Sequence, residues 1–439
     1  MNPSMQDALL RLGAVRIAAG AFLLLRSGFA FVTGRRYRAV DHLCTAVRIA
    51  NPGVLREFAL RRVLRIVRSL EGSGDNWLAR AYLADPASKA LADVFALSGK
   101  GKADLFRDLI VLKKHTPEEK GVILLKYART FSAVVALFDM PRLRERFIFV
   151  LEPCWAGYCD PSILMNIERG HPLLVMCFTE DDYRYIERVA GPLVPVRLGP
   201  ADWVNADVFA PPKETSKPYD LVMVANWGAH KRHVELFRAL QNVRDRDVRV
   251  LLCGFAWANR TADDIRREAA AYASPRVSVE ILESVPQTQL AGYVSQSKVF
   301  VFLTRKEGDN KALVEAMFAD VPSIVFDQTI GGAGSRVNPN TGVFAADAEL
   351  GEKIVYMLDN YRQFTPRAWA LANTGSAVST KRLDEFLRDA VTRSGGRYTA
   401  GIVEKTNAPN LVYKHPEVRA DFTADYEFIL SCQRASSLS

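Results

Sequence analysis

A polar loop leads directly from an apolar run, Val299–Leu303, into a helical pattern. Free backbone N–H groups at such a helix start, together with the helix dipole, form a site for anions. The residues of the loop and helix start that can contact a ligand are Glu307, Gly308, Asp309, Asn310 and Lys311. Asp309 or Asn310 can cap the helix, and Glu307 can reach a hydroxyl group of a bound sugar.

A second glutamate, Glu315, lies about one turn inside the expected helix. A carboxylate at this place suits the two neighbouring hydroxyls of a ribose, as an acidic residue does in dinucleotide-binding folds. Two glutamates eight residues apart are, by themselves, more typical of a capped helix with a solvated side chain. The pattern alone therefore leaves both interpretations open.

A basic cluster, residues 230–233, follows another apolar run, Leu221–Val224. The first strand–helix loop of a doubly wound sheet opens onto the ligand crevice. Lys231 in this loop offers a point charge to a phosphate group. The neighbouring cations would repel a metal ion, so the cluster favours a phosphate.

The sequence predicts no metal site and no cofactor. Its six cysteines are scattered, without a CxxC motif, which is typical of reduced thiols in a cytosolic protein. The triplet Asp245-Arg246-Asp247 resembles a metal-binding DxD motif, but it falls between an expected helix and an expected strand. We interpret it as a solvated turn.

Strands alternate with helices over the part of the chain that carries both clusters. The expected strands are Leu221–Val224, Val248–Cys253, Val277–Leu282, Val299–Leu303 and Ser323–Phe326, and the expected helices are Val234–Leu240, Ala262–Tyr272, Gln287–Ser295, Lys311–Phe318 and Glu352–Leu358. This alternation indicates βαβ units and a doubly wound parallel sheet. Such sheets bind ligands at the carboxyl ends of their strands.

The first half of the chain shows a weaker version of this pattern. Phe147–Leu151 and Leu173–Phe178 read as strands. Glu152 follows the first of them and either contacts a sugar or acceptor or has a structural role. We expect four regions: an N-terminal helical region (1–105), a first Rossmann-like domain (106–212), a second Rossmann-like domain (213–395) and a C-terminal tail (396–439), with a Pro/Lys-rich linker at 211–218.

Several runs resemble the group-1 (GT4-like) glycosyltransferases. EGDNKALVEAMFADVPSIV resembles their E-x7-E signature, with Glu307 and Glu315 as the two acids. DLVMVANWGAHKRHVELFRAL resembles the first strand, loop and helix of their donor domain, with Lys231 at the basic phosphate position. The resemblance covers about residues 202–358, is weak over 106–200 and is absent over 1–100.

The resemblance implies the GT-B fold, in which two Rossmann-like doubly wound domains face a cleft, here preceded by a helical region. It implies that a nucleotide sugar binds the C-terminal domain and that a glycan or lipid-linked acceptor binds the N-terminal one. Lys231 and the amides of the loop would stabilise the leaving diphosphate without a metal, and the anomeric configuration would be retained. Asn226 stands where the family often has arginine, and Glu283 where it often has glycine, so both are candidate donor contacts and the identity of the donor stays open.

Two other functions remain open from sequence. A GT-B sugar-nucleotide epimerase would use the same fold, and a non-catalytic nucleotide-sugar-binding or scaffold protein would keep the fold with a decayed site. The joint presence of Lys231, Glu307 and Glu315 favours a transferase.

The whole net charge of +9 resides in residues 1–70, which contain twelve arginines, no lysine and three acids. We find no nucleic-acid-binding signature, so we expect no nucleic-acid partner and favour an anionic membrane surface. The uncharged core of the stretch Ala8–Val32, Ile17–Leu25, is shorter than the roughly 20 residues of a membrane span. The stretch is either an interfacial amphipathic helix or a helix packed on its own domain. The sequence thus predicts a cytoplasmic protein for which a peripheral position on the membrane is an open alternative.

Overall fold

The computed structural model describes residues 13–72, 76–86, 105–155, 157–189, 191–212, 216–408 and 410–434. The chain forms two compact units. The first comprises Met1–Gly199, Thr380–Lys405 and Pro409–Ser439, and the second comprises Pro200–Ser379 and Thr406–Ala408. The expected linker at 211–218 lies partly outside the described residues.

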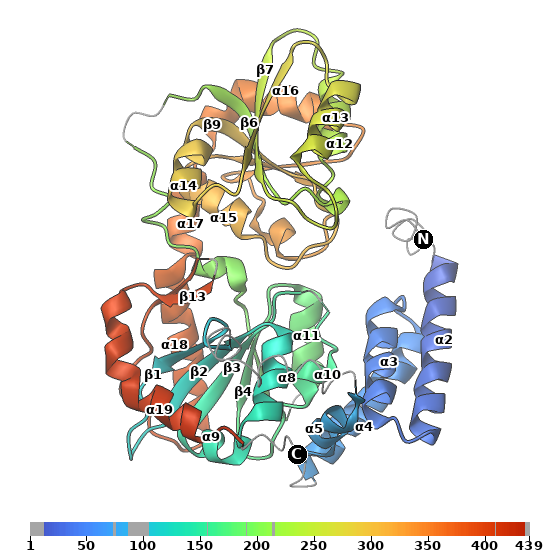
Figure 1. Cartoon of the computed structure of the whole chain (residues 1–439), viewed down its shortest axis with the longest axis vertical. Coiled ribbons are helices and arrows are strands. Elements are labelled where there is room, and N and C mark those ends of the chain that lie inside the picture. Colours follow the sequence, from blue (N-terminus) through green and yellow to red (C-terminus); the bar gives the residue numbers. More distant parts are fainter. Residues whose placement is uncertain are drawn as a thin grey trace. The chain divides into compact units, whose positions relative to one another are not determined.

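The first unit begins with helices, as the sequence predicted. They are α2 (Gly13–Val32), α3 (Arg36–Ile49), α4 (Val54–Gly72) and α5 (Trp77–Ala84). The Ser27 hydroxyl donates to the Ala39 carbonyl at 2.8 Å, and Arg16 Nε donates to the Ile49 carbonyl at 2.8 Å. These bonds attach α2 to α3 along its length (Figure 1). Residues 8–12 of the predicted apolar stretch lie outside the described residues.

A five-stranded sheet forms the core of the first unit. Its strands lie in chain order, β1 (Leu109–Lys113), β2 (Gly121–Lys126), β3 (Phe147–Glu152), β4 (Leu173–Met176) and β5 (Leu193–Val196), and only the β1–β2 pair is antiparallel. All residues of β1 to β4 are buried, which is typical of a sheet that is covered on both faces. The helices of this part are α8 (Ala128–Leu137), α9 (Met140–Arg146), α10 (Pro161–Leu164) and α11 (Glu180–Val189).

The end of the chain, which the sequence indicated only as a tail, contains further elements. After α17 (Pro366–Asn373) and α18 (Ser376–Arg393), the predicted tail, 396–439, contains β12 (Lys405–Ala408), β13 (Asn410–Tyr413) and α19 (Thr423–Ser431). The Tyr426 hydroxyl of α19 accepts a bond from the Val111 amide at 3.2 Å, and the Tyr413 hydroxyl donates to the Val111 carbonyl at 2.7 Å. β13 and α19 therefore pack against the first sheet.

The second unit is the predicted doubly wound sheet. Its strands are β6 (Tyr219–Val224), β7 (Val248–Gly254), β8 (Val277–Glu283), β9 (Ser297–Phe302), β10 (Ser323–Phe326) and β11 (Gly342–Ala345). All pairs are parallel and the order is β11-β10-β9-β6-β7-β8. The chain thus reverses its direction across the sheet between β6 and β9, and this switch point is where such folds bind ligands.

Helices cover both faces of this sheet. Side chains of α12 (His233–Leu240), α13 (Ala262–Tyr272) and α16 (Leu350–Asn360) join one apolar core. Side chains of α14 (Gln287–Ser295), α15 (Lys311–Phe318) and α17 join the other. Two buried layers on one sheet fix the loops at its carboxyl edge, and these loops carry the candidate residues.

Candidate functional site

The loops after β6 and β9 lie next to each other because these two strands are neighbours in the sheet. They bring Lys231 and Glu307, 76 positions apart in the numbering, into an ion pair with 2.7 Å between Nζ and Oε2. The Lys231 side chain is 7% exposed and that of Glu307 is 25% exposed. The carboxylate is thus the more accessible partner, and a ligand that reaches it also approaches the ammonium group.

Arg232, the neighbour of Lys231, has a structural task in this loop. Its backbone is left-handed, with φ of 65°, a conformation that costs a non-glycine residue free energy. Its guanidinium holds the loop by two bonds of 2.6 Å to the Asp347 carboxylate and one of 3.2 Å to the Leu303 carbonyl. Arg232 is therefore already engaged with protein groups, and Lys231 is the cation of the loop that is paired with the accessible acid.

The two histidines of the basic cluster add no positive charge at neutral pH. Burial lowers the pKa of His233 to about 3, with the nearby Arg260, Lys231 and His230 acting in the same direction. Burial and Lys231 also lower the pKa of His230. Neither ring nitrogen of His233 has a hydrogen-bond partner within the described residues, and its ring packs edge-on against Trp227 with centroids 5.5 Å apart. The ring is thus a neutral, packed group below the loop.

The second candidate acid, Glu315, is buried in α15 and only 7% exposed. Its Oε1 accepts a bond from Gln287 Nε2 at 3.2 Å, and burial raises its pKa above the usual range. Asn310 is the N-cap of α15, because its Oδ1 accepts from the Leu313 amide at 2.8 Å. Lys311 donates to the Asn407 carbonyl at 3.2 Å. The helix start is therefore capped by Asn310, not by Asp309.

Asp309 instead belongs to a buried charge network that the sequence did not reveal. Arg336 donates to Asp309 at 2.8 and 3.0 Å and to Asp202 at 2.9 Å, and Thr374 donates to Asp202 at 2.6 Å. The Ala201 amide also donates to Asp309, at 2.9 Å. Because both carboxylates are held by one guanidinium, the network fixes the loop that carries Glu307 rather than offering a free acid to a ligand.

Two glycines allow the chain to pack closely against this loop. A Cβ at Gly331 would lie 2.1 Å from the Glu307 carbonyl oxygen, and one at Gly332 would lie 2.3 Å from Asp309 Oδ1. The backbones are joined by bonds from the Glu307 amide to the Ile330 carbonyl (3.0 Å) and from the Gly332 amide to the Gly308 carbonyl (2.9 Å). The glycine-rich run before Arg336 is the sequence signal that could have pointed to this contact.

Asn226 and Glu283 shape the first loop from its two sides. Asn226 Oδ1 accepts a bond from the Gly228 amide at 3.1 Å. Glu283 Oε1 accepts a bond from the Trp227 indole at 2.9 Å. Both predicted contact residues thus lie around Trp227 near the carboxyl edge of the sheet.

Glu152, the candidate of the first unit, is a fully buried residue. It lies at the carboxyl end of β3 and forms an ion pair of 2.7 Å with Lys405, in which neither side chain is exposed. Burial lowers the pKa of Lys405 to about 8, although the Glu152 carboxylate acts in the opposite direction. The arrangement is that of an internal structural pair.

Within the described ranges, no group of three or more histidine, cysteine, aspartate or glutamate side chains is placed to hold a metal ion. Asp245 and Arg246 form an exposed ion pair of 2.9 Å. The DxD-like triplet therefore has the solvated surroundings expected of a turn.

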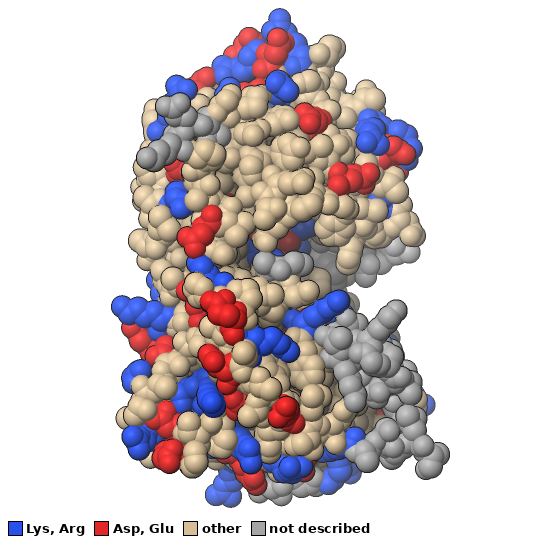
Figure 2. Space-filling view, turned by 60° about the vertical axis from the view of Figure 1, so that its left-hand side comes forward, with Lys and Arg blue, Asp and Glu red and all other residues tan. Residues whose placement is uncertain are grey.

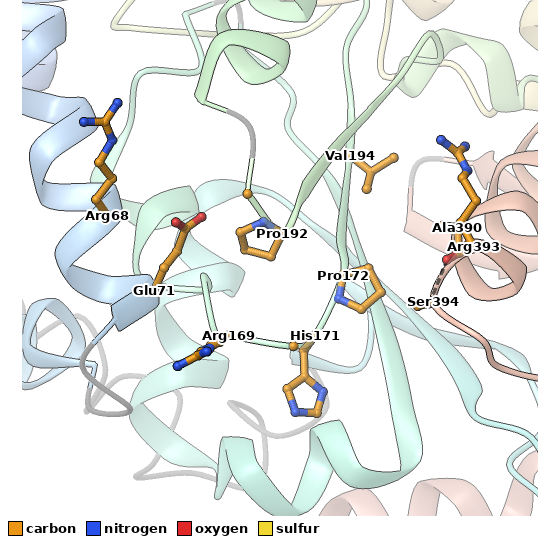
Figure 3. Close-up of a pocket in the computed structure, with 12 residues that line it drawn as sticks. Arg68, Glu71, Arg169, His171, Pro172, Pro192, Val194, Ala390, Arg393 and Ser394 are labelled. Carbon is orange, nitrogen blue, oxygen red and sulfur yellow. Dashed lines mark hydrogen bonds between the residues drawn. The ribbon is translucent and has the colours of Figure 1, made fainter.

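A cavity of about 700 Å³ lies in the first unit, away from the carboxyl ends of the strands (Figure 3). Arg68 and Glu71 of α4 line one side of it, and Arg393 lies on another. His171 and Pro192 come directly before β4 and β5, so the cavity borders the amino edge of the sheet. Ligands of parallel sheets bind at the opposite edge, and the cavity is therefore not the candidate site.

Comparison with known proteins identifies the second unit. Residues 218–360 match the family model described as glycosyl transferases group 1. This segment of the chain is therefore similar to the group-1 glycosyl transferases. The matched segment runs from the start of β6 to the end of α16 and contains Lys231, Glu307 and Glu315, whereas Glu152 and Asp202 lie outside it.

Two curated relatives share the description GDP-mannose:cellobiosyl-diphosphopolyprenol alpha-mannosyltransferase. The one from Xanthomonas campestris is 31% identical over 29% of this chain and 36% of its own length. The one from Komagataeibacter xylinus is 27% identical over 49% of this chain and 52% of its own length. The chain thus spans about half or less of the curated relatives that it matches.

Among solved structures, the chain is similar to Anabaena HepE in complex with UDP-glucose. The identity is 13%, the TM-score is 0.48, and the alignment covers 70% of this chain and 90% of that chain.

Proposed function

We propose that the chain transfers a sugar from a nucleotide sugar, held by the second unit, to a glycan or lipid-linked acceptor, held by the first. The observation that carries the proposal is the Lys231–Glu307 pair at the switch point of a doubly wound sheet, beside the capped start of α15. A diphosphate needs a cation and free amides, and a sugar hydroxyl needs an accessible carboxylate. Lys231 and Glu307, the proposed cation and carboxylate, lie on adjacent loops here.

In the proposed reaction, the bond between the anomeric carbon and the diphosphate breaks through an oxocarbenium-like state. The diphosphate gains negative charge as it leaves, so a positioned cation stabilises the transition state more than the bound donor. Lys231 takes this role, and Glu307 binds and orients the sugar. The resemblance to the family supports retention of configuration and a reaction without a metal ion.

Glu315 is the proposed ribose contact. Its side chain is almost wholly buried, and Gln287 engages one carboxylate oxygen. A carboxylate held in one position loses little conformational freedom when it accepts hydroxyl bonds, which favours tight and specific binding.

The printed names of the curated relatives suggest the first donor and acceptor to test. They support a GDP-mannose donor and a diphosphopolyprenol-linked saccharide as the acceptor class. A lipid-linked acceptor supports a cytoplasmic protein that works at a membrane surface.

The test is turnover of a panel of nucleotide sugars, with and without a lipid-linked saccharide, by the wild-type chain and by Glu307→Gln. We expect transfer from one donor, and we expect the variant to bind the nucleotide normally but to transfer poorly. Nucleotide binding without release of the sugar from any donor would instead indicate a non-catalytic binding protein, and epimerised nucleotide sugar would indicate an epimerase.

A further inference from the structure

Helix α2 is apolar on two opposite faces, and only one of them is packed. The packed face is built from small residues, because Gly20, Ser27 and Ala30 are its buried positions. A Cβ at Gly20 would lie 2.6 Å from a Leu55 methyl group, so α2 approaches the start of α4 very closely. This face is folded against the protein.

The other face of α2 exposes large apolar side chains. At helical spacing it presents Ile17, Phe22, Leu25, Phe29 and Val32, which are 53%, 59%, 75%, 68% and 88% exposed. Ala14, Ala18 and Ala21 lie between them on the same side, and this side carries no charged residue. A helix that is apolar all round is normally buried all round, and exposed apolar patches mark interaction sites.

In Figure 1, α2 is the outermost helix of the first unit, with α3 between it and the first sheet. The exposed face of α2 is therefore not turned toward the core of its own unit. Phe58 and Val54 of α4, 49% and 89% exposed, add apolar surface beside the Gly20–Leu55 contact.

Arginines border this apolar face. Arg26 lies with its guanidinium 5.9 Å from the centre of the Phe22 ring, and Arg35 and Arg36 follow directly after the exposed end of the helix. Arg62 of α4 stacks over Phe58 at 5.1 Å. By contrast, basic and acidic side chains are interspersed over the face of the molecule drawn in Figure 2.

We propose that the exposed face of α2, bordered by Arg26, Arg35 and Arg36, inserts into the interface of an anionic lipid bilayer. The apolar side chains would enter the acyl region and the guanidinium groups would bind lipid phosphates. The helix lies in the interface rather than crossing it, because its other face remains bonded to α3 through Ser27 and Arg16.

Length alone does not decide between these positions. With 20 residues, α2 is the one helix among the described residues that is long and apolar enough to cross a membrane. A crossing helix would have to leave the close Gly20–Leu55 contact. Insertion of one face keeps that contact and covers the exposed side chains.

A bilayer fits this surface better than a second copy of the chain does. Residues 13–72 contain eleven arginines and three acids, so a second copy would bring like charge to the contact. Anionic lipids bring opposite charge. The lipid-linked acceptor proposed above would also lie in such a bilayer, although the membrane contact of α2 does not depend on it.

Two ion pairs attach the helical region to the rest of the first unit. Arg48 of α3 pairs with Asp160 at 3.0 Å, in the segment that follows β3. Glu57 of α4 receives bonds of 2.6 and 3.0 Å from Arg188 at the end of α11. One contact thus lies in the segment after the carboxyl end of β3, and the other lies at the end of α11, just before the amino end of β5.

The test is co-sedimentation of the full chain with vesicles of phosphatidylcholine, with and without phosphatidylglycerol, and with no acceptor present. We expect the wild type to partition onto the mixed vesicles at least tenfold more than onto pure phosphatidylcholine. Leu25→Glu/Phe29→Glu should lose at least tenfold of the partition onto mixed vesicles. Leu371→Glu, at a 49% exposed position in the second unit, is the matched control and should partition like the wild type.

The charge requirement is tested separately with Arg35→Gln/Arg36→Gln, which should lose threefold or more of the partition onto mixed vesicles. Arg266→Gln/Arg362→Gln in the second unit is the control and should lose little. GDP binding by calorimetry should be unchanged in all variants, so a wrong nucleotide assignment would not be confused with a wrong membrane surface.

Equal partition of the wild type and Leu25→Glu/Phe29→Glu would overturn the proposal. A wild-type dimer in sedimentation velocity that the same double variant converts to a monomer would also overturn it, because a second copy would then cover α2.

Discussion

Each unit contains a lysine–glutamate pair that includes a residue at or after the carboxyl end of a strand, and the two pairs differ in exposure. Lys231–Glu307 and Lys405–Glu152 have the same separation of 2.7 Å. In the first pair the side chain of Lys231 is 7% exposed and that of Glu307 is 25% exposed, whereas in the second pair neither side chain is exposed. In the function proposed here, the accessible pair serves a ligand and the buried pair serves the fold, and accessibility of the carboxylate makes the difference.

The buried pair should matter for stability and not for the donor. Replacing Lys405 by Met leaves the Glu152 carboxylate buried without its nearest counter-charge, which costs about 3 kcal/mol, the low end for a broken buried pair. The low end is expected because Lys126 also interacts with Glu152. Urea denaturation measures the loss, and calorimetry should show unchanged GDP affinity.

Lys298→Met provides the control for this prediction. Lys298 pairs with Asp220 at 2.7 Å, but the side chains are 31% and 15% exposed and the pair lies at the amino ends of β9 and β6. Its loss should cost less than about 1 kcal/mol. A cost for Lys405→Met that is no larger than this would mean that burial does not distinguish the two pairs.

The accessible pair should show the opposite behaviour. Lys231→Ala should lower kcat at saturating donor by about 100-fold, the usual loss for one transition-state donor, which equals about 3 kcal/mol. Steady-state kinetics with the true donor measure the change, and Lys298→Ala is the matched control. A raised KM with unchanged kcat would reduce Lys231 to a binding contact.

The third prediction concerns the neutral histidine beside Lys231. The pKa of His233 is lowered from 6.5 to about 3 by burial. In the unfolded chain the ring takes up a proton as the pH falls below 6.5, and in the folded chain it does so only near 3. Its contribution to stability is therefore fully present above 6.5 and is lost as the pH falls toward 3.

Between pH 7 and 5 this loss amounts to about 2 kcal/mol. His233→Phe keeps an aromatic ring against Trp227 but has no group that titrates there. Between pH 7 and 5 its free energy of unfolding should therefore fall by about 2 kcal/mol less than that of the wild type. Urea denaturation at the two pH values provides the comparison, with His415→Phe, at an exposed position, as the control. Equal losses in all three proteins would show that His233 is protonated in the fold.

The sequence predicted most elements of the second unit because β6, β7, β8 and β9 are each followed by a helix; β11, which follows β10 without an α-helix between them, was not predicted. Adjacent parallel strands then place the Lys231 and Glu307 loops together. The strands of the first unit were predicted less well because β1 to β4 are buried on both faces. Such strands show no alternation of polar and apolar residues.

The long-range charge networks could not be read from the sequence. Arg336 lies 27 residues from Asp309 and 134 from Asp202, and Lys405 lies 253 residues from Glu152. Local patterns carry no information about such partners. For this reason the sequence offered Asp309 as a possible helix cap and left the role of Glu152 open, although Asp309 is held by Arg336 and Glu152 is fully buried.

The smallest expected effect concerns Glu315, which combines features of both pairs, since it is buried like Glu152 but belongs to the donor unit. If it accepts ribose hydroxyl bonds, Glu315→Ala removes charge-assisted hydrogen bonds worth about 1.5 kcal/mol, so GDP affinity should fall about tenfold. The fold should persist, because removal also abolishes the burial of a carboxylate whose pKa is already raised. Calorimetric titration with GDP and with deoxy-GDP distinguishes a ribose contact from a structural role of Glu315. The wild type should prefer the ribose form and the variant should bind both alike. An unchanged preference in the variant would place Glu315 with Glu152 among the structural acids.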